Sequence, residues 1–200
     1  MSAERAPRVA ALVLAAGLSR RMAGVNKLLA PVAGVPLVAR AVDAALASRA
    51  EPVVVVTGHE ADRVRGALGG RPLAFAHNPD PARGLASSLA AGVAALGGDA
   101  VDGALVCLGD MPWVGAEVLD ALIDAFARRP ERPVCIPFHE ERRGNPVLWP
   151  ARHFAALTSL EGDVGGRALL EELAEPVHAL AVACPGVLRD VDEPSDLASG

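Results

Sequence analysis

The sequence predicts an α/β fold with a doubly wound, mostly parallel sheet in one domain. Apolar runs of strand length alternate with segments of helical periodicity over the first 130 residues, a pattern typical of successive βαβ units. The length of 200 residues and the apolar fraction of 52% suit one globular domain of this class. The sequence contains no internal repeat, low-complexity segment or linker.

The first part of the chain gives the clearest alternation. We expect strands over 9–14, 53–56, 73–76 and 103–108, with helices over 37–46, 60–68, 84–96 and 115–127. The run from Val53 to Val56 is β-branched throughout, as in strands buried on both faces of a parallel sheet. Pro36 is expected at a helix start, where a missing N–H costs little.

The later part departs from this alternation. A strand is expected over 134–138, followed by a hairpin or crossover through 145–149 with Gly144 and Asn145 in its tight turn. A helix is expected over 167–173, and short strands over 177–182 and 187–191. The departure from alternation can form the rim of a second substrate pocket.

Composition excludes several classes of protein. A net charge of −5 argues against nucleic acid as the main partner. No apolar run reaches membrane-spanning length, and residues 1–8 lack the apolar core of a signal peptide. Three scattered cysteines, Cys107, Cys135 and Cys184, form no C-x-x-C pair and fit reduced thiols. We therefore expect a cytoplasmic protein with no membrane partner.

The loop after the first expected strand is rich in small and basic residues. It carries Gly17, Ser19, Arg20, Arg21, Gly24, Asn26 and Lys27. The chain contains eighteen arginines but a single lysine, Lys27, and a lysine acts on phosphate as a point charge whereas arginine acts as a planar fork. The loop indicates a polyphosphate site, with a solvated basic loop as the alternative.

Asp110 is the main candidate for a metal ligand. It follows the expected strand 103–108, and open α/β sheets bind ligands at the carboxyl ends of their strands. A carboxylate beside a polyphosphate is what Mg²⁺ requires, although a turn residue would also fit. The sequence contains no H-E-x-x-H, G-x-S-x-G, Walker A or G-x-G-x-x-G motif.

A series of motifs runs through nearly the whole chain. It begins with Leu14-Ala15-Ala16-Gly17-x-Ser19-x-Arg21-Met22, Lys27-Leu28-Leu29 and Gly34-x-Pro36-Leu37. It continues with Val55-Val56-Thr57-Gly58-His59, Asn78-Pro79-Asp80, Gly84-Leu85-x-x-Ser88-Leu89, Gly109-Asp110-Met111-Pro112, Arg143-Gly144-Asn145-Pro146-Val147, Gly162-Asp163-x-Gly165-x-Arg167 and Asp190-Val191-Asp192-x-Pro194-x-Asp196-Leu197. The series strongly resembles the nucleotidyltransferases that activate sugars, cofactors and alcohol phosphates. Within that superfamily it most resembles the molybdenum-cofactor cytidylyltransferases and their accessory relatives.

This resemblance implies a three-layer α/β sandwich with a Rossmann-like, mostly parallel sheet of the nucleotide-diphospho-sugar transferase type. It implies one nucleotidyltransferase domain over 1–200, with a nucleotide-binding half at about 8–112 and a second-substrate half at about 113–200. The implied reaction transfers CMP from CTP to the terminal phosphate of a molybdopterin-type cofactor and releases pyrophosphate, with Mg²⁺ as cofactor. A molybdenum hydroxylase or its maturation factor is a possible protein partner.

Several alternatives stay open. The nucleotide could be GTP, and the acceptor could be another phosphorylated substrate such as a sugar phosphate or a phospholactate. A non-catalytic chaperone for cofactor insertion and a redox protein that reuses the fold with a nicotinamide nucleotide are further alternatives. Neither of these last two needs a magnesium–triphosphate site, so Lys27 and Asp110 argue against both.

The resemblance also implies roles for individual residues. Catalytic roles are implied for Lys27, Arg21 and Asp110, and metal binding for Asp110 and Asp192. Nucleotide binding is implied for Leu14, Ala15, Ala16, Gly17, Ser19, Arg21, Lys27, Asn78, Ser88 and Gly109. Second-substrate binding is implied for Arg143, Gly144, Asn145, Pro146, Gly162 and Asp163. Helix capping and turn formation are the alternative roles for Ser88, Asp163 and the glycines.

Overall fold

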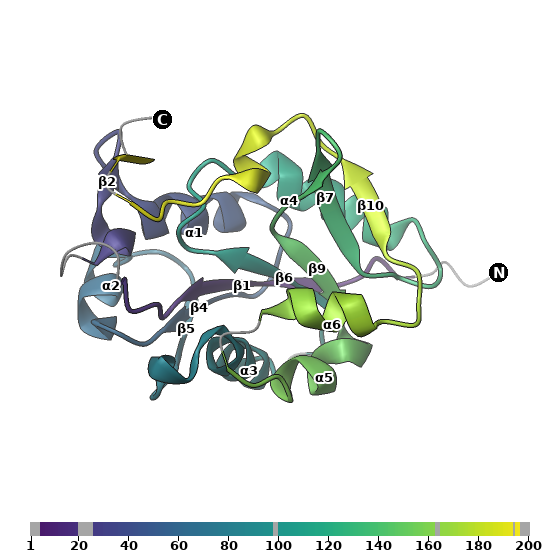
Figure 1. Ribbon diagram of the computed structural model, residues 1–200, viewed down its shortest axis with the longest axis horizontal. Coiled ribbons are helices and arrows are strands. Elements are labelled where there is room, and N and C mark those ends of the chain that lie inside the picture. Colours follow the sequence, from purple (N-terminus) through teal and green to yellow (C-terminus); the bar gives the residue numbers. More distant parts are fainter. Residues whose placement is uncertain (1–4, 20–25, 98–99, 163–164, 194, 197–200) are drawn as a thin grey trace.

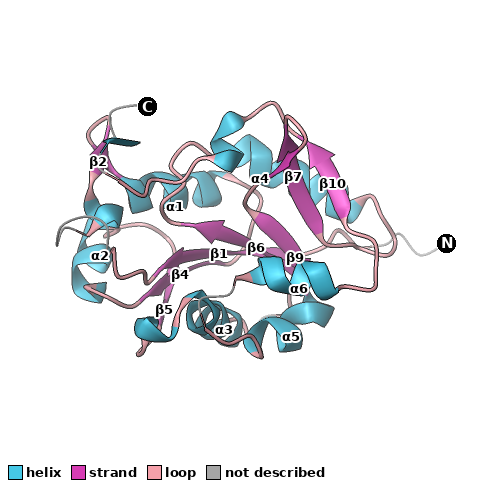
Figure 2. Cartoon of the chain, in the orientation of Figure 1, coloured by secondary structure: helices cyan, strands magenta, loops and turns pink. Residues whose placement is uncertain are grey.

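The structure, a computed structural model, describes residues 5–19, 26–97, 100–162, 165–193 and 195–196. It is a three-layer α/β sandwich in which one twisted sheet lies between two layers of helices (Figure 1; Figure 2). The predicted fold class is therefore confirmed. No helix in the described ranges has the length and apolar character needed to cross a membrane.

The described secondary structure comprises strands, α-helices and short 3-10 helices. The strands are β1 (Val9–Ala15), β2 (Pro31–Val32), β3 (Val35–Pro36), β4 (Val53–Thr57), β5 (Ala74–His77), β6 (Gly103–Leu108), β7 (Cys135–His139), β8 (Arg142–Arg143), β9 (Val147–Pro150) and β10 (His178–Ala181). The α-helices are α1 (Leu37–Ala47), α2 (Ala61–Ala67), α3 (Leu85–Ala95), α4 (Ala116–Ala127), α5 (Phe154–Thr158) and α6 (Gly166–Glu172). The 3-10 helices are η1 (Lys27–Leu29), η2 (Pro81–Arg83), η3 (Ala151–His153) and η4 (Pro185–Leu188).

The main sheet has the strand order β10-β7-β9-β6-β1-β4-β5, with β8 paired to β7. Strands β6, β1, β4 and β5 are parallel, whereas β9 is antiparallel to both β6 and β7. After β1 the chain moves outward to β4 and β5, then returns to the other side of β1 to form β6. The carboxyl ends of β1 and β6 therefore form the topological switch point, where open α/β sheets bind their ligands.

Strand β1 is buried on both faces, as its apolar sequence predicts. Its odd-numbered side chains belong to the core that includes α1, α2 and α4, and its even-numbered side chains belong to the core that includes α3 and α5. Gly92 allows α3 to approach the sheet closely, because a Cβ atom there would lie 2.9 Å from Val56 Cγ2. The two layers hold the carboxyl ends of the parallel strands in fixed positions.

The predicted alternation over the first 130 residues is confirmed, with boundaries that differ by at most one residue. The prediction of a turn at Gly144-Asn145 is wrong. The β7–β8 turn lies at Glu140 and Glu141, whose φ angles of 48° and 62° are left-handed, as two-residue hairpin turns require. Gly144 and Asn145 come after β8, and Asn145 N–H donates to Val187 O over 2.9 Å.

The predicted strand over 187–191 is also wrong. The 3-10 helix η4 covers Pro185–Leu188 instead, because Pro185 is suited to a first helical turn. Helix α5, which packs against α3, was not predicted from the sequence.

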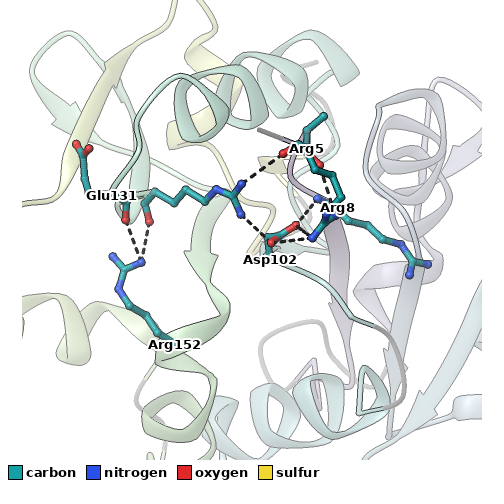
Figure 3. A network of polar contacts seen from close by, with 7 residues as sticks. Arg5, Arg8, Asp102, Glu131 and Arg152 are labelled. Atoms are coloured by element: carbon teal, nitrogen blue, oxygen red, sulfur yellow. Dashed lines mark hydrogen bonds and ion pairs between the residues drawn. The ribbon is translucent and has the colours of Figure 1, made fainter. Parts of the chain in front are cut away.

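A network of arginines joins the amino ends of the central strands (Figure 3). Asp102, just before β6, accepts hydrogen bonds from the Arg8 backbone N–H at 2.7 Å and from Arg132 Nη1 at 2.7 Å. Arg5 Nη2 donates to Asp102 over 3.2 Å. This network lies at the end of the sheet opposite the switch point. It therefore contributes to the stability of the fold and not to ligand binding at the switch point.

Candidate active site at the switch point

A cleft of about 560 Å³ lies at the carboxyl ends of the parallel strands. Its walls come from the loop after β1, from η2 and the start of α3, from the carboxyl end of β6, and from Gly162 and Asp192. The lining residues are Leu14, Ala16, Gly17, Leu18, Ser19, Lys27, Leu28, Pro81, Ala82, Arg83, Gly84, Leu85, Ser88, Leu108, Asp110, Gly162 and Asp192. The cleft therefore lies where open α/β sheets usually bind their ligands.

The Lys27 ammonium, in this cleft, joins its own loop to the end of β6 and to the C-terminal segment at 191–192. Its Nζ lies 2.7 Å from Asp110 Oδ2 and 3.1 Å from Asp192 Oδ1. It also donates to the Val191 carbonyl oxygen over 2.9 Å. An ammonium has three N–H donors, and these three oxygens provide an acceptor for each.

Local hydrogen bonds fix the backbone of Lys27. Asn26 is buried and caps η1, with its Oδ1 accepting from the Leu28 N–H at 3.1 Å. The Lys27 N–H donates to Ser19 Oγ over 3.0 Å, which ties the end of the loop to its beginning. The side chain thus starts from a fixed point and extends toward the cleft.

Asp110 is positioned by the close approach of β6 to β1. Gly109 N–H donates to Leu14 O over 3.0 Å, and a Cβ atom at Gly109 would lie 2.9 Å from that oxygen. The Val191 N–H donates to the Asp110 carbonyl over 3.0 Å and brings the last segment of the chain alongside. Glycine is therefore needed immediately before the aspartate.

The C-terminal segment that carries Asp192 is anchored by Val191. The Val191 side chain is fully buried with Val32 of the β2–β3 hairpin and Leu37 of α1. Figure 1 shows this segment, in yellow, running beside the hairpin. Arg189 adds a second anchor, because its guanidinium lies 4.1 Å from the centre of the Trp113 ring, a favourable cation–π geometry.

The electrostatics of Asp110 and Lys27 are coupled. Burial raises the pKa of Asp110 above its ordinary value, and the Lys27 ammonium opposes this effect. Burial lowers the pKa of Lys27, but Asp110 and Asp192 outweigh it, so the net pKa of Lys27 is raised. Lys27 is therefore charged at neutral pH, and its ammonium compensates the charge of the partly buried Asp110 carboxylate.

The oxygen ligands at this point suit a hard divalent cation. Asp110, Asp192 and the Val191 carbonyl already surround one positive charge, the ammonium. Magnesium prefers one or two carboxylates together with water and phosphate oxygens. No group of three or more His, Cys, Asp or Glu side chains suited to a metal occurs in the ranges that the structure describes. Asp110 and Asp192 fit such an ion if water and a phosphate complete its coordination.

Comparison with known proteins identifies the family to which this protein belongs. Residues 11–177 match the family described as the MobA-like NTP transferase domain. The chain belongs to that family. Its relatives include the bifunctional protein GlmU of Kineococcus radiotolerans, which is 37% identical over 129 residues, covering 64% of this chain and 26% of the relative. The chain thus spans about a quarter of the length of the curated relatives that it matches.

Solved structures of similar proteins agree with the family assignment. Rv0371c from Mycobacterium tuberculosis H37Rv has a TM-score of 0.86 at 28% identity, with 98% of this chain and 97% of that one covered. A nucleotidyl transferase from Methanothermobacter has a TM-score of 0.81 at 25% identity, with 96% and 95% covered. A further structure of Rv0371c is a complex with manganese. The family is one of nucleotidyltransferases, in which a divalent metal is expected.

The structure brings together many of the site residues that the sequence predicts for this NTP transferase. Those that line the cleft are Leu14, Ala16, Gly17, Ser19, Lys27, Ser88, Asp110, Gly162 and Asp192. Arg21 and Asp163 lie outside the described residues. Two distant predictions, Asp110 and Asp192, thus meet at Lys27.

Other predicted nucleotide ligands lie behind the cleft wall. The Ala15 side chain is buried with the core that includes α1, and Gly109 permits the close contact with Leu14. Asn78 is buried, and its Nδ2 donates to Ser87 Oγ at 2.8 Å and Ser88 Oγ at 3.0 Å. These three residues therefore do not line the cleft, and Asn78 orients the Ser88 hydroxyl that does.

The predicted second-substrate residues separate into two places. Gly162 lines the cleft, and its carbonyl accepts from the Ala86 N–H in α3 at 3.3 Å. The segment 143–146 is not among the described residues that line the cleft. Arg143 is exposed on β8, and Gly144 packs against Val187.

Two polar groups at the site, the Arg83 side chain and the Val191 carbonyl, were not predicted. Arg83 lines it as an exposed cation at the end of η2, and its place soon after a parallel strand was a usable signal. The Val191 carbonyl has no such signal, because any residue provides a carbonyl and only the tertiary structure brings it to Lys27.

Proposed function

We propose that this protein transfers CMP from CTP to the terminal phosphate of a molybdopterin-type cofactor and releases pyrophosphate. The observation that carries the proposal is the contact of Lys27 with Asp110 and Asp192 at the switch point. In such a site the lysine can bind the phosphates of a triphosphate, and the two carboxylates can bind its metal ion. The sequence series that resembles molybdenum-cofactor cytidylyltransferases supports the choice of nucleotide and acceptor.

In the proposed reaction, an oxygen of the acceptor phosphate attacks the α-phosphorus of CTP. A new O–P bond forms, the bond from the α-phosphorus to the bridging oxygen breaks, and the electron pair leaves with pyrophosphate. A phosphate monoester is largely ionised at pH 7, so no side chain need act as a general base. The protein must align the reactants and neutralise the charge that develops.

Lys27 is proposed to neutralise the phosphates, and Arg21 to assist it. When bound, Mg²⁺ supplies further neutralisation of the phosphate charge, held by Asp110 and Asp192. Ser88, whose hydroxyl accepts a hydrogen bond from Asn78, is proposed to contact the base. Gly17 has open space where a side chain would extend, so the nucleotide can approach the backbone of the loop.

We propose that the chain acts as one nucleotidyltransferase domain. Residues 8–112 would form the nucleotide-binding half, and residues 113–200 the second-substrate half. Gly162 borders the cleft from the second half, which supports a second substrate there. Asp163 and the segment 143–146 are proposed to extend that pocket, as their resemblance to the molybdopterin branch implies.

Pyrophosphate release tests the proposed function. The protein is incubated with Mg²⁺ and each of the four nucleoside triphosphates, with and without isolated molybdopterin cofactor. We expect release only with CTP and the cofactor together. Release with GTP would change the nucleotide, and release with a different phosphorylated acceptor would change the second substrate. No release with any combination would favour the non-catalytic chaperone.

A further inference from the structure

The Lys27 ammonium occupies the position that the proposed function gives to a divalent cation. Its three neighbours, Asp110 Oδ2, Asp192 Oδ1 and the Val191 carbonyl, lie at 2.7, 3.1 and 2.9 Å. All three N–H donors of the ammonium therefore have protein acceptors. In this arrangement Lys27 has no remaining donor for a phosphate.

We propose that Lys27 and a divalent cation exchange at the Asp110–Asp192 pair, so that the metal binds there only when the lysine moves to the nucleotide phosphates. The inference rests on the proposed function, because it gives the same lysine a second binding position. An ammonium and a divalent ion at these same oxygen atoms would repel each other strongly at contact distance. Binding of one cation to Asp110 Oδ2 and Asp192 Oδ1 therefore opposes binding of the other.

The side chain of Lys27 is able to make this move. Its backbone is held by Ser19 and by the η1 turn, while the four-carbon stem of lysine is flexible. The side chain lines the cleft and is 15% exposed. A phosphate in the cleft would offer it acceptors of the same charge as the carboxylates that it leaves.

Exchange couples the two ligands. A triphosphate attracts the ammonium and frees the carboxylates, and a metal on the carboxylates frees the ammonium. Each ligand therefore raises the affinity for the other, as linkage requires. The free protein holds a divalent ion weakly because its own lysine competes for the site.

Manganese binding without nucleotide tests the exchange. Free Mn²⁺ is measured by electron paramagnetic resonance during titration of the wild-type protein, Lys27→Met and Arg40→Met. Arg40 donates to the Pro112 carbonyl at 3.3 Å, so its replacement removes the same charge close to the site but frees no carboxylate. We expect Lys27→Met to bind Mn²⁺ about tenfold or more tightly than wild type, because a like charge has been removed from the site. Arg40→Met should stay within about twofold, as expected for a charge that is screened by solvent.

An Mn²⁺ affinity of Lys27→Met that is equal to or below that of wild type would overturn the exchange. So would an equal gain in Arg40→Met, which would indicate a general charge effect. If circular dichroism shows that Lys27→Met does not fold, Lys27→Gln provides the same comparison. CTP titration of the same variant separates the two proposals: unchanged CTP affinity would remove the triphosphate role of Lys27 and leave the Mn²⁺ result standing.

Discussion

Lys27 Nζ and Asp110 Oδ2 lie 2.7 Å apart, although the two residues follow different strands, β1 and β6. The contact joins the basic loop to the carboxylate across the switch point of the sheet. Lys27→Met should therefore reduce pyrophosphate release by about 10²-fold or more, because charge neutralisation at the phosphates is lost. Lys27→Arg should recover little activity, since a planar fork cannot replace a compact ammonium among three acceptors.

Initial rates of pyrophosphate release at saturating CTP check this prediction. Arg49→Met is the matched control, because Arg49 pairs with Asp120 and Asp124 on the surface of α4. It should keep the wild-type rate. Wild-type activity in Lys27→Met would contradict the assignment.

Trp113 should control the position of Asp192. Its ring stacks under Arg189, and its carbonyl accepts from Cys184 Sγ at 3.4 Å. Trp113→Ala removes the ring but keeps the carbonyl, so the C-terminal segment loses one anchor. We expect a raised KM for CTP, with a smaller effect on kcat, measured by steady-state kinetics. Trp149→Phe, in the buried core on the other side of the sheet, serves as the control; equal KM changes in both variants would argue against a specific anchor.

The parts of this fold that could be predicted are those in which local sequence and burial agree. Strands β1 and β4 are apolar because both faces are covered, and so their positions follow from composition alone. Lys27 and Asp110 could be placed together because the carboxyl ends of parallel strands meet at one edge. Asp192 needed the family resemblance, since the acidic run around it is equally typical of a solvated tail.

The parts that could not be predicted depend on tertiary contacts. Segment 187–191 has the apolar content of a strand, but Gly186 packs so closely on Trp113 that a Cβ atom would lie 2.3 Å from its carbonyl oxygen. Glu140 and Glu141 form a hairpin turn in left-handed conformations that glycine or asparagine usually adopts. Gly144-Asn145 has those residue types, which is why the sequence predicts the turn there.

Asp102 should matter for stability and not for activity. Its carboxylate accepts hydrogen bonds from the Arg8 backbone N–H and from the Arg132 guanidinium, and it is largely shielded from solvent. Asp102→Ala should lower the free energy of unfolding by about 2 kcal/mol, because charged hydrogen-bonding groups lose their partner. Asp43→Ala, which breaks the exposed pair with Arg71, should cost about 0.5 kcal/mol or less. Urea denaturation measures the free energy of unfolding of both variants. An equal decrease in the two would show that the Asp102 network stabilises the fold no more than an exposed ion pair does.

The buried cysteines should be unreactive in the folded protein. Burial raises the pKa of the Cys107 thiol to about 12 and that of the Cys135 thiol to about 12, so neither forms a thiolate at pH 8. Cys184 is partly exposed. Titration with a disulfide reagent at pH 8 should modify at most one thiol in the native protein and three in guanidinium chloride. Rapid modification of two or more native thiols would contradict the burial of Cys107 and Cys135.

The dependence of CTP binding on Mg²⁺ tests the central claim, that Asp110 and Lys27 form one metal and triphosphate site. Calorimetric titrations with CTP are made with Mg²⁺ and with a chelator, for wild type and Asp110→Asn. Wild type should bind CTP more tightly with Mg²⁺, and Asp110→Asn should lose most of that gain, about tenfold or more, because a neutral amide is a poor ligand for Mg²⁺. Asp110→Asn that kept the full Mg²⁺-dependent gain would contradict the account.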